Sequence, residues 1–98
     1  MSAYLIANIR VKDAALFDQY RDQVAPMIAA YGGRYLIRGG AVTAMEGDPR
    51  LDRLIVLEFP SMDKLKAFYH GTEYAPLIAL RQRATEGEVA LVEGYAPV

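Results

Sequence analysis

The sequence predicts an α+β fold, with helices covering one face of a four-stranded antiparallel sheet. Segments rich in β-forming residues alternate with segments whose apolar residues recur at helical spacing. Their order is strand, helix, strand, strand, helix and strand, and a glycine interrupts the second helical segment. The chain has 98 residues, which suits one domain over residues 1–98.

The first strand is expected over residues 3–11, which are rich in β-forming side chains. Asp13 is a suitable N-cap for the helix that follows, whose apolar stripe extends to Tyr31. Pro26 lies inside this stripe and has no backbone N–H, so we expect a kink or a break there. Gly32 is well placed to end the helix.

A hairpin is expected next. Its first strand covers residues 34–37, is interrupted by a bulge or bend at Gly39 and Gly40, and resumes over residues 42–46. The partner strand covers residues 53–59 and is strongly apolar. Turn-forming residues separate the two strands, as a hairpin requires.

The second half of the chain is expected to contain a broken helix and a last strand. A helix over residues 62–69 is broken at Gly71, and a second short helix begins near Thr72 and ends at Glu86. The last strand is expected over residues 88–95. The complete order is βαββαβ, which is the ferredoxin-like arrangement.

The sheet is expected to associate with a second copy. The strands at residues 3–11 and 53–59 are apolar on both faces, while the helices can cover only one face. A second sheet packed on the open face would remove that surface from water. The sequence therefore predicts a homodimer that forms through the outer sheet faces.

The amino-acid composition limits which other classes of partner are expected. The chain has 11 basic and 12 acidic residues, and this balance gives no field to attract nucleic acid or an anionic membrane. It has no cysteine, which fits a reducing compartment. Neither a signal peptide nor a membrane span is recognised, so a cytoplasmic location is expected.

Three segments together resemble a known family: YGGRYLIRGG at residues 31–40, LEFPSMDKLKAFYHGTEYAPLIALR at residues 57–81, and VALVEGY at residues 89–95. They are similar to the domain of unknown function 1330 family, within the dimeric α+β barrel group. The resemblance implies two ferredoxin-like sheets packed face to face into a barrel. The wider group includes cofactor-free and haem-degrading monooxygenases, isomerases and binding proteins, and fold kinship cannot choose among them.

Two residues could take part in acid–base chemistry. His70 is the only histidine, and its ordinary pKa suits proton transfer near neutral pH. It follows the helix at residues 62–69, where it could equally be a capping residue. Glu58 is a carboxylate in an apolar strand. It could form a structural ion pair with Arg34 or Arg38, or it could orient or deprotonate a ligand.

A candidate ligand pocket follows from the remaining polar residues on apolar stripes. Arginines can bind a carboxylate or an enolate through paired N–H donors, and tyrosines can line a pocket for a flat ligand. Each residue could instead be structural, as a snorkelling cation or a core tyrosine. We expect the pocket on the helix side of the sheet, near the helix break, with candidates Glu58, His70, Tyr74, Arg81, Arg38, Tyr20 and Asn8.

No motif specifies a reaction. Phosphate loops, nucleophile elbows and closed metal sites are absent from the sequence, and no cofactor or metal is expected. The predicted function is a small homodimeric protein of unknown activity with a possible pocket for a small anionic or aromatic ligand. The alternatives are a cofactor-independent monooxygenase or isomerase acting on an aromatic or enolisable compound, and a non-catalytic binding or structural dimer.

Overall fold

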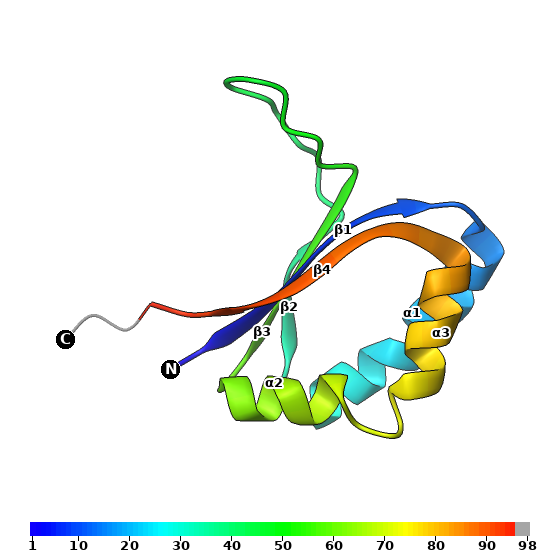
Figure 1. The fold of residues 1–98 in the computed structure, drawn as a ribbon, viewed down its shortest axis with the longest axis vertical. Coiled ribbons are helices and arrows are strands. Elements are labelled where there is room, and N and C mark those ends of the chain that lie inside the picture. The colour runs from blue at the N-terminus through cyan, green and yellow to red at the C-terminus, as the bar shows by residue number, and fades with distance from the viewer. Residues whose placement is uncertain (96–98) are drawn as a thin grey trace.

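The computed structural model describes residues 1–95. A four-stranded antiparallel sheet has the order β2-β3-β1-β4, and the helices lie on one face of it (Figure 1). This is the ferredoxin-like α+β fold that the sequence predicted. The elements are β1 (Ala3–Val11), α1 (Ala14–Ala30), β2 (Arg34–Arg38), β3 (Arg53–Phe59), α2 (Met62–Tyr69), α3 (Ala75–Ala84) and β4 (Thr85–Glu93).

The two central strands separate apolar residues onto two faces. In β1, the alternate residues from Ala3 to Ile9 are buried beneath the helices. In β3, Leu57 and Phe59 are buried on that same side. The intervening residues lie on the outer face, where Ile6 is paired with Val56 and is 36% exposed.

The α2 end of the molecule is closely packed. Phe68 of α2 lies 5.3 Å from the ring of Phe59 and 4.4 Å from the ring of Tyr74, between ring centroids. All three side chains are almost completely buried. Stacked aromatic rings of this kind contribute beyond the area they bury. They fix α2 against the sheet and set where α3 begins.

Helix α1 is one continuous helix from Ala14 to Ala30, with Pro26 inside it. The expected break at Pro26 is therefore wrong. The ring of Pro26 is on the exposed side of the helix, while Val24 and Ile28 on the other side are buried. Burial of these neighbours offsets the hydrogen bond that proline removes. Asp13 caps the helix as predicted, since its side chain accepts from the backbone N–H of Leu16.

The expected strand over residues 42–46 is also wrong. Strand β2 ends at Arg38, and residues 39–52 form a loop that projects beyond the sheet (Figure 1). Strand β3 begins at Arg53, and its pairing with β2 ends at Arg38 and Ile55, so no strand among residues 1–95 lies opposite residues 42–46. The predicted interruption at the glycine pair is a bend at Gly39, and a separate bulge lies at Leu36, where Tyr35 pairs with Leu57 and Ile37 with Val56.

Strand β4 begins earlier than expected, at Thr85. Helix α3 ends at Ala84, where the hydroxyl of Thr85 donates to the backbone oxygen of Arg81 at 2.8 Å. The backbone N–H of Lys12 donates to the Ala84 oxygen at 2.8 Å and ties the helix end to the end of β1. Within the described residues, none of the helices has the length and apolar character needed to cross a membrane.

Candidate functional site

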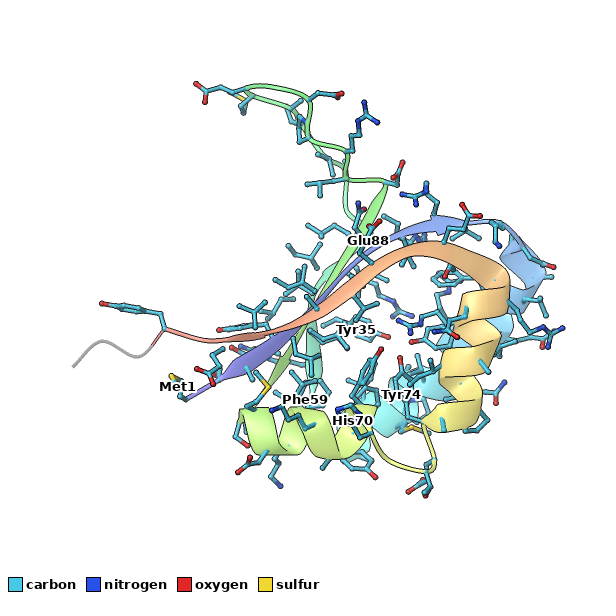
Figure 2. All side chains as sticks on the ribbon, viewed as in Figure 1. Met1, Tyr35, Phe59, His70, Tyr74 and Glu88 are labelled. Atoms are coloured by element: carbon cyan, nitrogen blue, oxygen red, sulfur yellow. The ribbon has the colours of Figure 1, made fainter. Side chains whose placement is uncertain are left out.

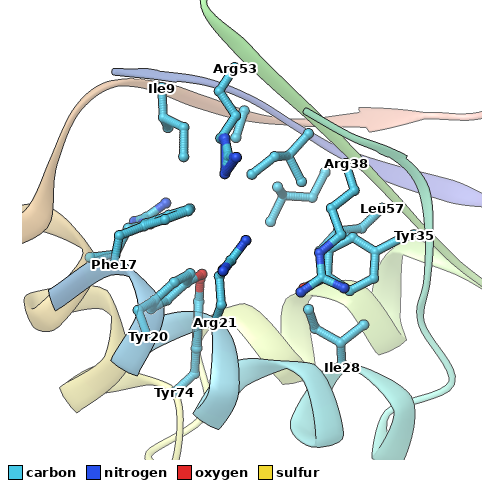
Figure 3. Close-up of a pocket in the computed structure, with 14 residues that line it drawn as sticks. Ile9, Phe17, Tyr20, Arg21, Ile28, Tyr35, Arg38, Arg53, Leu57 and Tyr74 are labelled. Atoms are coloured by element: carbon cyan, nitrogen blue, oxygen red, sulfur yellow. The ribbon is translucent and has the colours of Figure 1, made fainter. Parts of the chain in front are cut away.

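A cavity lies between the sheet and the helices α1 and α3 (Figure 3). Its volume is about 40 Å³. This is room for roughly three water-sized groups, which is comparable to one carboxylate group. Its floor is formed by inward-facing apolar residues of the two central strands: Leu5, Ala7, Ile9, Ile55 and Leu57. One small polar group of a ligand therefore fits the enclosed part.

Two tyrosines supply hydroxyl groups to this cavity. Tyr20 lies on the buried stripe of α1, and Tyr74 is the residue before α3. Their hydroxyl oxygens are 2.7 Å apart (Figure 3). Burial raises the pKa of both phenols, so both are neutral at pH 7. Their mutual hydrogen bond uses one proton, which leaves the second O–H free to donate to a bound group.

Arg81 is the most buried cation of the site. It lies on α3 in phase with Tyr74 and Leu77, and only 7% of it is exposed. Its Nε atom is buried and has no hydrogen-bond partner within residues 1–95. Burial opposes its charge, but the Tyr74 hydroxyl and neighbouring tyrosines favour it, and the pKa of Arg81 lies above its ordinary value. The guanidinium is thus charged at every physiological pH.

The charged residues at the cavity all have the same sign. Four arginines line it, namely Arg21, Arg38, Arg53 and Arg81. Within the part of the chain that the structure describes, no aspartate, glutamate, lysine or histidine lines it with them. Low-dielectric walls that enclose charges of one sign concentrate a positive potential inside. The site therefore attracts anions.

The bulge at Leu36 brings Arg38 to the cavity. Strictly alternating residues would put Arg34 and Arg38 on the same face of β2. The extra residue shifts the register, so Arg34 is opposite Glu58 on the outer face and Arg38 is opposite Ile55 on the inner face. The guanidinium of Arg38 lies 4.5 Å from the ring centre of Tyr35.

Four of the seven candidate residues from the sequence line this cavity together: Tyr20, Arg38, Tyr74 and Arg81. Figure 2 shows Tyr74 between the sheet and the helices, on the same side as Tyr35. The cavity thus lies on the helix side of the sheet, and Tyr74 at the helix break is part of it.

Three candidates lie elsewhere. Glu58 is on the outer face, because its neighbours Leu57 and Phe59 point inward. It accepts from Arg34 Nε at 2.7 Å and from the Tyr4 hydroxyl at 3.2 Å. The Arg34 hydrogen bond lowers the pKa of Glu58. These contacts match the ion pair that the sequence left open as the alternative to a ligand role.

His70 and Asn8 also lie outside the cavity. His70 is the exposed C-cap residue of α2, and its ring packs edge-on against Tyr69 (Figure 2). Asn8 fixes the long loop, since its amide donates to the Arg50 oxygen at 2.7 Å and accepts from the Asp52 N–H at 3.0 Å. Both side chains are accounted for by local structure.

Sequence reasoning missed two lining residues, Arg21 and Arg53. Arg21 follows Phe17 by four residues on α1, so helical spacing brings it to the buried stripe. Arg53 is two residues before Ile55 on β3, and strand alternation puts both on the inner face. Both signals were present in the sequence. Elsewhere among residues 1–95, no group of three or more histidine, aspartate or glutamate side chains could hold a metal ion.

A family comparison agrees with this fold. The model of the family described as domain of unknown function DUF1330 matches residues 2–95. The chain belongs to the DUF1330 family. No curated protein matches the sequence significantly.

Solved structures resemble the DUF1330 chain at the level of the fold. A protein of unknown function from Rhodopseudomonas palustris, RPA0582, is 16% identical with a TM-score of 0.74, and the match covers 98% of this chain and 84% of that one. SnoaB, a cofactor-independent oxygenase from Streptomyces nogalater, is 14% identical with a TM-score of 0.62, over 99% and 96% of the two chains. A Bacteroides thetaiotaomicron protein described as a possible oxidoreductase is 15% identical with a TM-score of 0.57, over 95% and 97%.

Proposed function

We propose that this protein binds a small organic anion in the cavity between its sheet and helices. The observation that supports the proposal is the state of Arg81. Its side chain is 7% exposed, its Nε has no partner within residues 1–95, and no carboxylate lines the cavity with it. A bound carboxylate would supply the missing acceptor.

The energetics favour a ligand over a purely structural role. An unpaired buried charge destabilises a folded protein, and well-packed apolar residues of similar volume are often more stabilising. In the empty protein, the charge of Arg81 is favoured only by neighbouring tyrosines, and its Nε has no acceptor within residues 1–95. An anion would form charge-assisted hydrogen bonds with it, and the Tyr20–Tyr74 pair has one further O–H to donate.

Replacing Arg81 by methionine tests this proposal. Arg81→Met keeps much of the side-chain volume and removes the charge. We expect the melting temperature of the free protein to change by no more than a few degrees, because the cost of burying the charge and the tyrosine contacts that favour it are removed together. Binding of small carboxylates such as benzoate or glutarate, measured by isothermal titration calorimetry, should be lost.

The matched control is Arg83→Met, an exposed position on the same helix. This variant should bind carboxylates like the parent protein. Retained binding in Arg81→Met would contradict the proposal. A strong fall in its melting temperature would also contradict it, because Arg81 would then satisfy a structural partner.

A second candidate function is oxygenation of a substrate that is already ionised. No lining residue within residues 1–95 can act as a general base at neutral pH. The ionisable groups there are arginines and three tyrosines, and burial raises the pKa of each tyrosine. The site could still hold a phenolate or an enolate beside neutral O–H donors and Arg81. The fold similarity to the oxygenase SnoaB supports testing this reaction class.

Oxygen uptake with an ionisable hydroquinone tests the second candidate. Turnover should fall at least tenfold in both Tyr20→Phe and Tyr74→Phe, since either change breaks the hydroxyl pair that presents one O–H to the anion (roughly the loss of one hydrogen bond to a charged group). Binding of the hydroquinone without any oxygen uptake would contradict the oxygenase function and leave anion binding as the one function proposed.

We also propose that the protein is a homodimer formed through the outer sheet face. This face is apolar at its centre, with exposed Ile6, Leu36, Ile37 and Val92. Several of its charged groups are paired within the chain, as in Arg34–Glu58 at 2.7 Å and Arg10–Asp52 at 3.4 Å, and Glu88 on β4 is exposed without an ion pair among residues 1–95. A largely apolar face with little excess charge suits a second copy of itself better than a strongly charged partner.

A further inference from the structure

Three arginines besides Arg81 line the cavity, and each lies over an aromatic ring. The guanidinium carbons of Arg21 and Arg53 are 5.7 Å and 5.2 Å from the ring centre of Phe17, and that of Arg38 is 4.5 Å from the ring centre of Tyr35. Each distance is within the range of a cation–π contact. The rings therefore hold these side chains at the cavity without neutralising them.

Of these three arginines, only Arg21 has an acidic partner among the residues that the structure describes. Its Nη2 is 2.8 Å from the Asp18 carboxylate on the same helix. Among residues 1–95, neither Arg38 nor Arg53 has a carboxylate within salt-bridge distance. A ring contact uses the face of the guanidinium, so the N–H groups at its edge are free to bind an anion.

The four arginines are not equivalent in depth. Arg81 is buried, Arg53 is half-buried and Arg38 is exposed. In Figure 3, Arg53 of β3 and Arg38 of β2 both extend toward the space above Tyr20 and Tyr74. The site thus has an inner cationic end at Arg81 and an outer cationic end at Arg38 and Arg53.

Size separates the two ends as well. The cavity volume of about 40 Å³ is comparable to one carboxylate-sized group. The rest of any larger ligand must therefore extend toward the exposed Arg38. Apolar side chains of the strand floor, such as Ile55 and Leu57, lie along this route. They suit a short apolar linker between two polar ends.

From these observations we infer that the ligand is a dianion, a short dicarboxylate or a similar molecule with an anionic group at each end. This inference rests on the proposed anion-binding function. One carboxylate binds Arg81 and the free tyrosine hydroxyl. The second binds the N–H edges of Arg38 and Arg53 at the mouth of the cavity. The connecting carbons lie over Ile55 and Leu57.

The test compares dicarboxylates from malonate to suberate with their monomethyl esters, which have the same length and one charge fewer. Isothermal titration calorimetry of the full chain should show the best diacid binding at least about tenfold more tightly than its ester, the value of one charge-assisted contact. Arg38→Gln and Arg53→Gln should weaken the diacid to the level of the parent's ester binding and weaken the ester far less. Arg50→Gln, on the long loop and paired with Asp48, is the charge-matched control and should change neither.

The outcomes separate the two proposals. Equal affinity of diacid and ester, or an equal loss for both in Arg38→Gln and Arg53→Gln, would overturn the dianion and leave the anion site in place. No binding by any diacid or ester of the series would overturn both. Ester binding that disappears in Arg81→Met, together with diacid selectivity that disappears in Arg53→Gln, is the result expected.

Discussion

The hydroxyl groups of Tyr20 and Tyr74 are a polar pair inside an apolar interior, 2.7 Å apart. Tyr20→Phe or Tyr74→Phe leaves the other hydroxyl buried without this partner, so each should cost about 1–3 kcal/mol of unfolding free energy. The double variant should cost at least about 0.5 kcal/mol less than the sum, because no orphaned hydroxyl remains. Urea denaturation of the four proteins measures this coupling.

Tyr31→Phe is the control for this cycle. Tyr31 is half-buried, and its hydroxyl makes no hydrogen bond within residues 1–95. Its removal should cost less than either change at the pair. Strictly additive losses at Tyr20 and Tyr74 would show that the two hydroxyls do not depend on each other.

Glu58 gives the stability of this protein a predictable dependence on pH. Hydrogen bonds from Arg34 and Tyr4 stabilise its carboxylate and lower its pKa below the ordinary 4.5. A group whose pKa is lowered by folding contributes stability above its unfolded pKa and loses it as the pH falls through the folded pKa. Glu58→Gln should therefore melt at a lower temperature than the parent at pH 7, and the difference should shrink below pH 4.5.

Melting curves between pH 7 and pH 3 check this expectation. Glu46→Gln, at an exposed position of the long loop, should show no such convergence. A Glu58→Gln difference that stays constant through the acidic range would mean that the carboxylate charge contributes nothing to folding.

At the residue scale, sequence reasoning succeeded where side chains follow the regular spacing of a helix or the regular alternation of a strand. The buried stripes of α1 and α3 identified Tyr20, Tyr74 and Arg81 correctly as neighbours of the interior. Because neighbouring side chains of a strand point to opposite faces, the inward position of Leu57 would also have put Glu58 on the outer face. The inward position of Arg38 could not be derived in this way, because it depends on a bulge with no local glycine or proline signal.

Gly87 is the residue on which the pairing of β1 with β4 depends. A Cβ built there would lie 2.1 Å from the backbone oxygen of Asn8, and its φ of 155° is disfavoured for other residues. Gly87→Ala must therefore push the two strands apart. We expect a loss of at least about 2 kcal/mol in unfolding free energy, as for other strained backbone sites.

Gly40→Ala is the matched control, because a Cβ there would meet no atom within 4 Å. It should change the unfolding free energy by about 0.5 kcal/mol or less, as is usual for an exposed surface position. A Gly87→Ala variant as stable as Gly40→Ala would show that the strands can separate at this point without cost.

Element bounds were predicted well where one physical signal dominated, and poorly where two competed. Burial of Phe17, Val24 and Ile28 on one side of α1 outweighed the helix-breaking tendency of Pro26. The apolar residues near Val42 suggested a strand, but the residues that would face them across the hairpin, 47–52, form no strand, so the segment has nothing to pair with. Long-range pairing decided both cases, and single-sequence patterns do not contain it.

At the scale of the whole molecule, the cavity forms only when several helices and strands of the chain pack together. Its lining comes from β1, β2, β3, α1 and α3, and the 17-residue α1 alone contributes both Tyr20 and Arg21. The fold follows from the order of the elements, which the sequence contains. The arrival of Arg38 beside the other three arginines follows from the shifted register of β2, which only the assembled sheet defines.

The outer face of the sheet offers a direct test of the proposed dimer. Ile6 lies at its centre, on the strand that pairs with both β3 and β4, and is 36% exposed in one chain. In a symmetric dimer formed through this face, one Ile6→Lys change places a charge in the interface twice. The dissociation constant should rise at least about a hundredfold, because both charges lose water without gaining a partner. Analytical ultracentrifugation should show a dimer for the parent at micromolar concentration and a monomer for Ile6→Lys.

Gln19→Lys is the control, because this position lies on the exposed side of α1, on the helix layer of the molecule. It adds the same charge and should leave the dimer intact. A monomeric parent would remove the dimer proposal. A dimer that resists Ile6→Lys and dissociates with Gln19→Lys would place the interface on the helices instead, where the buried pairs of the cavity, such as Tyr20 and Tyr74, would lie close to the second chain.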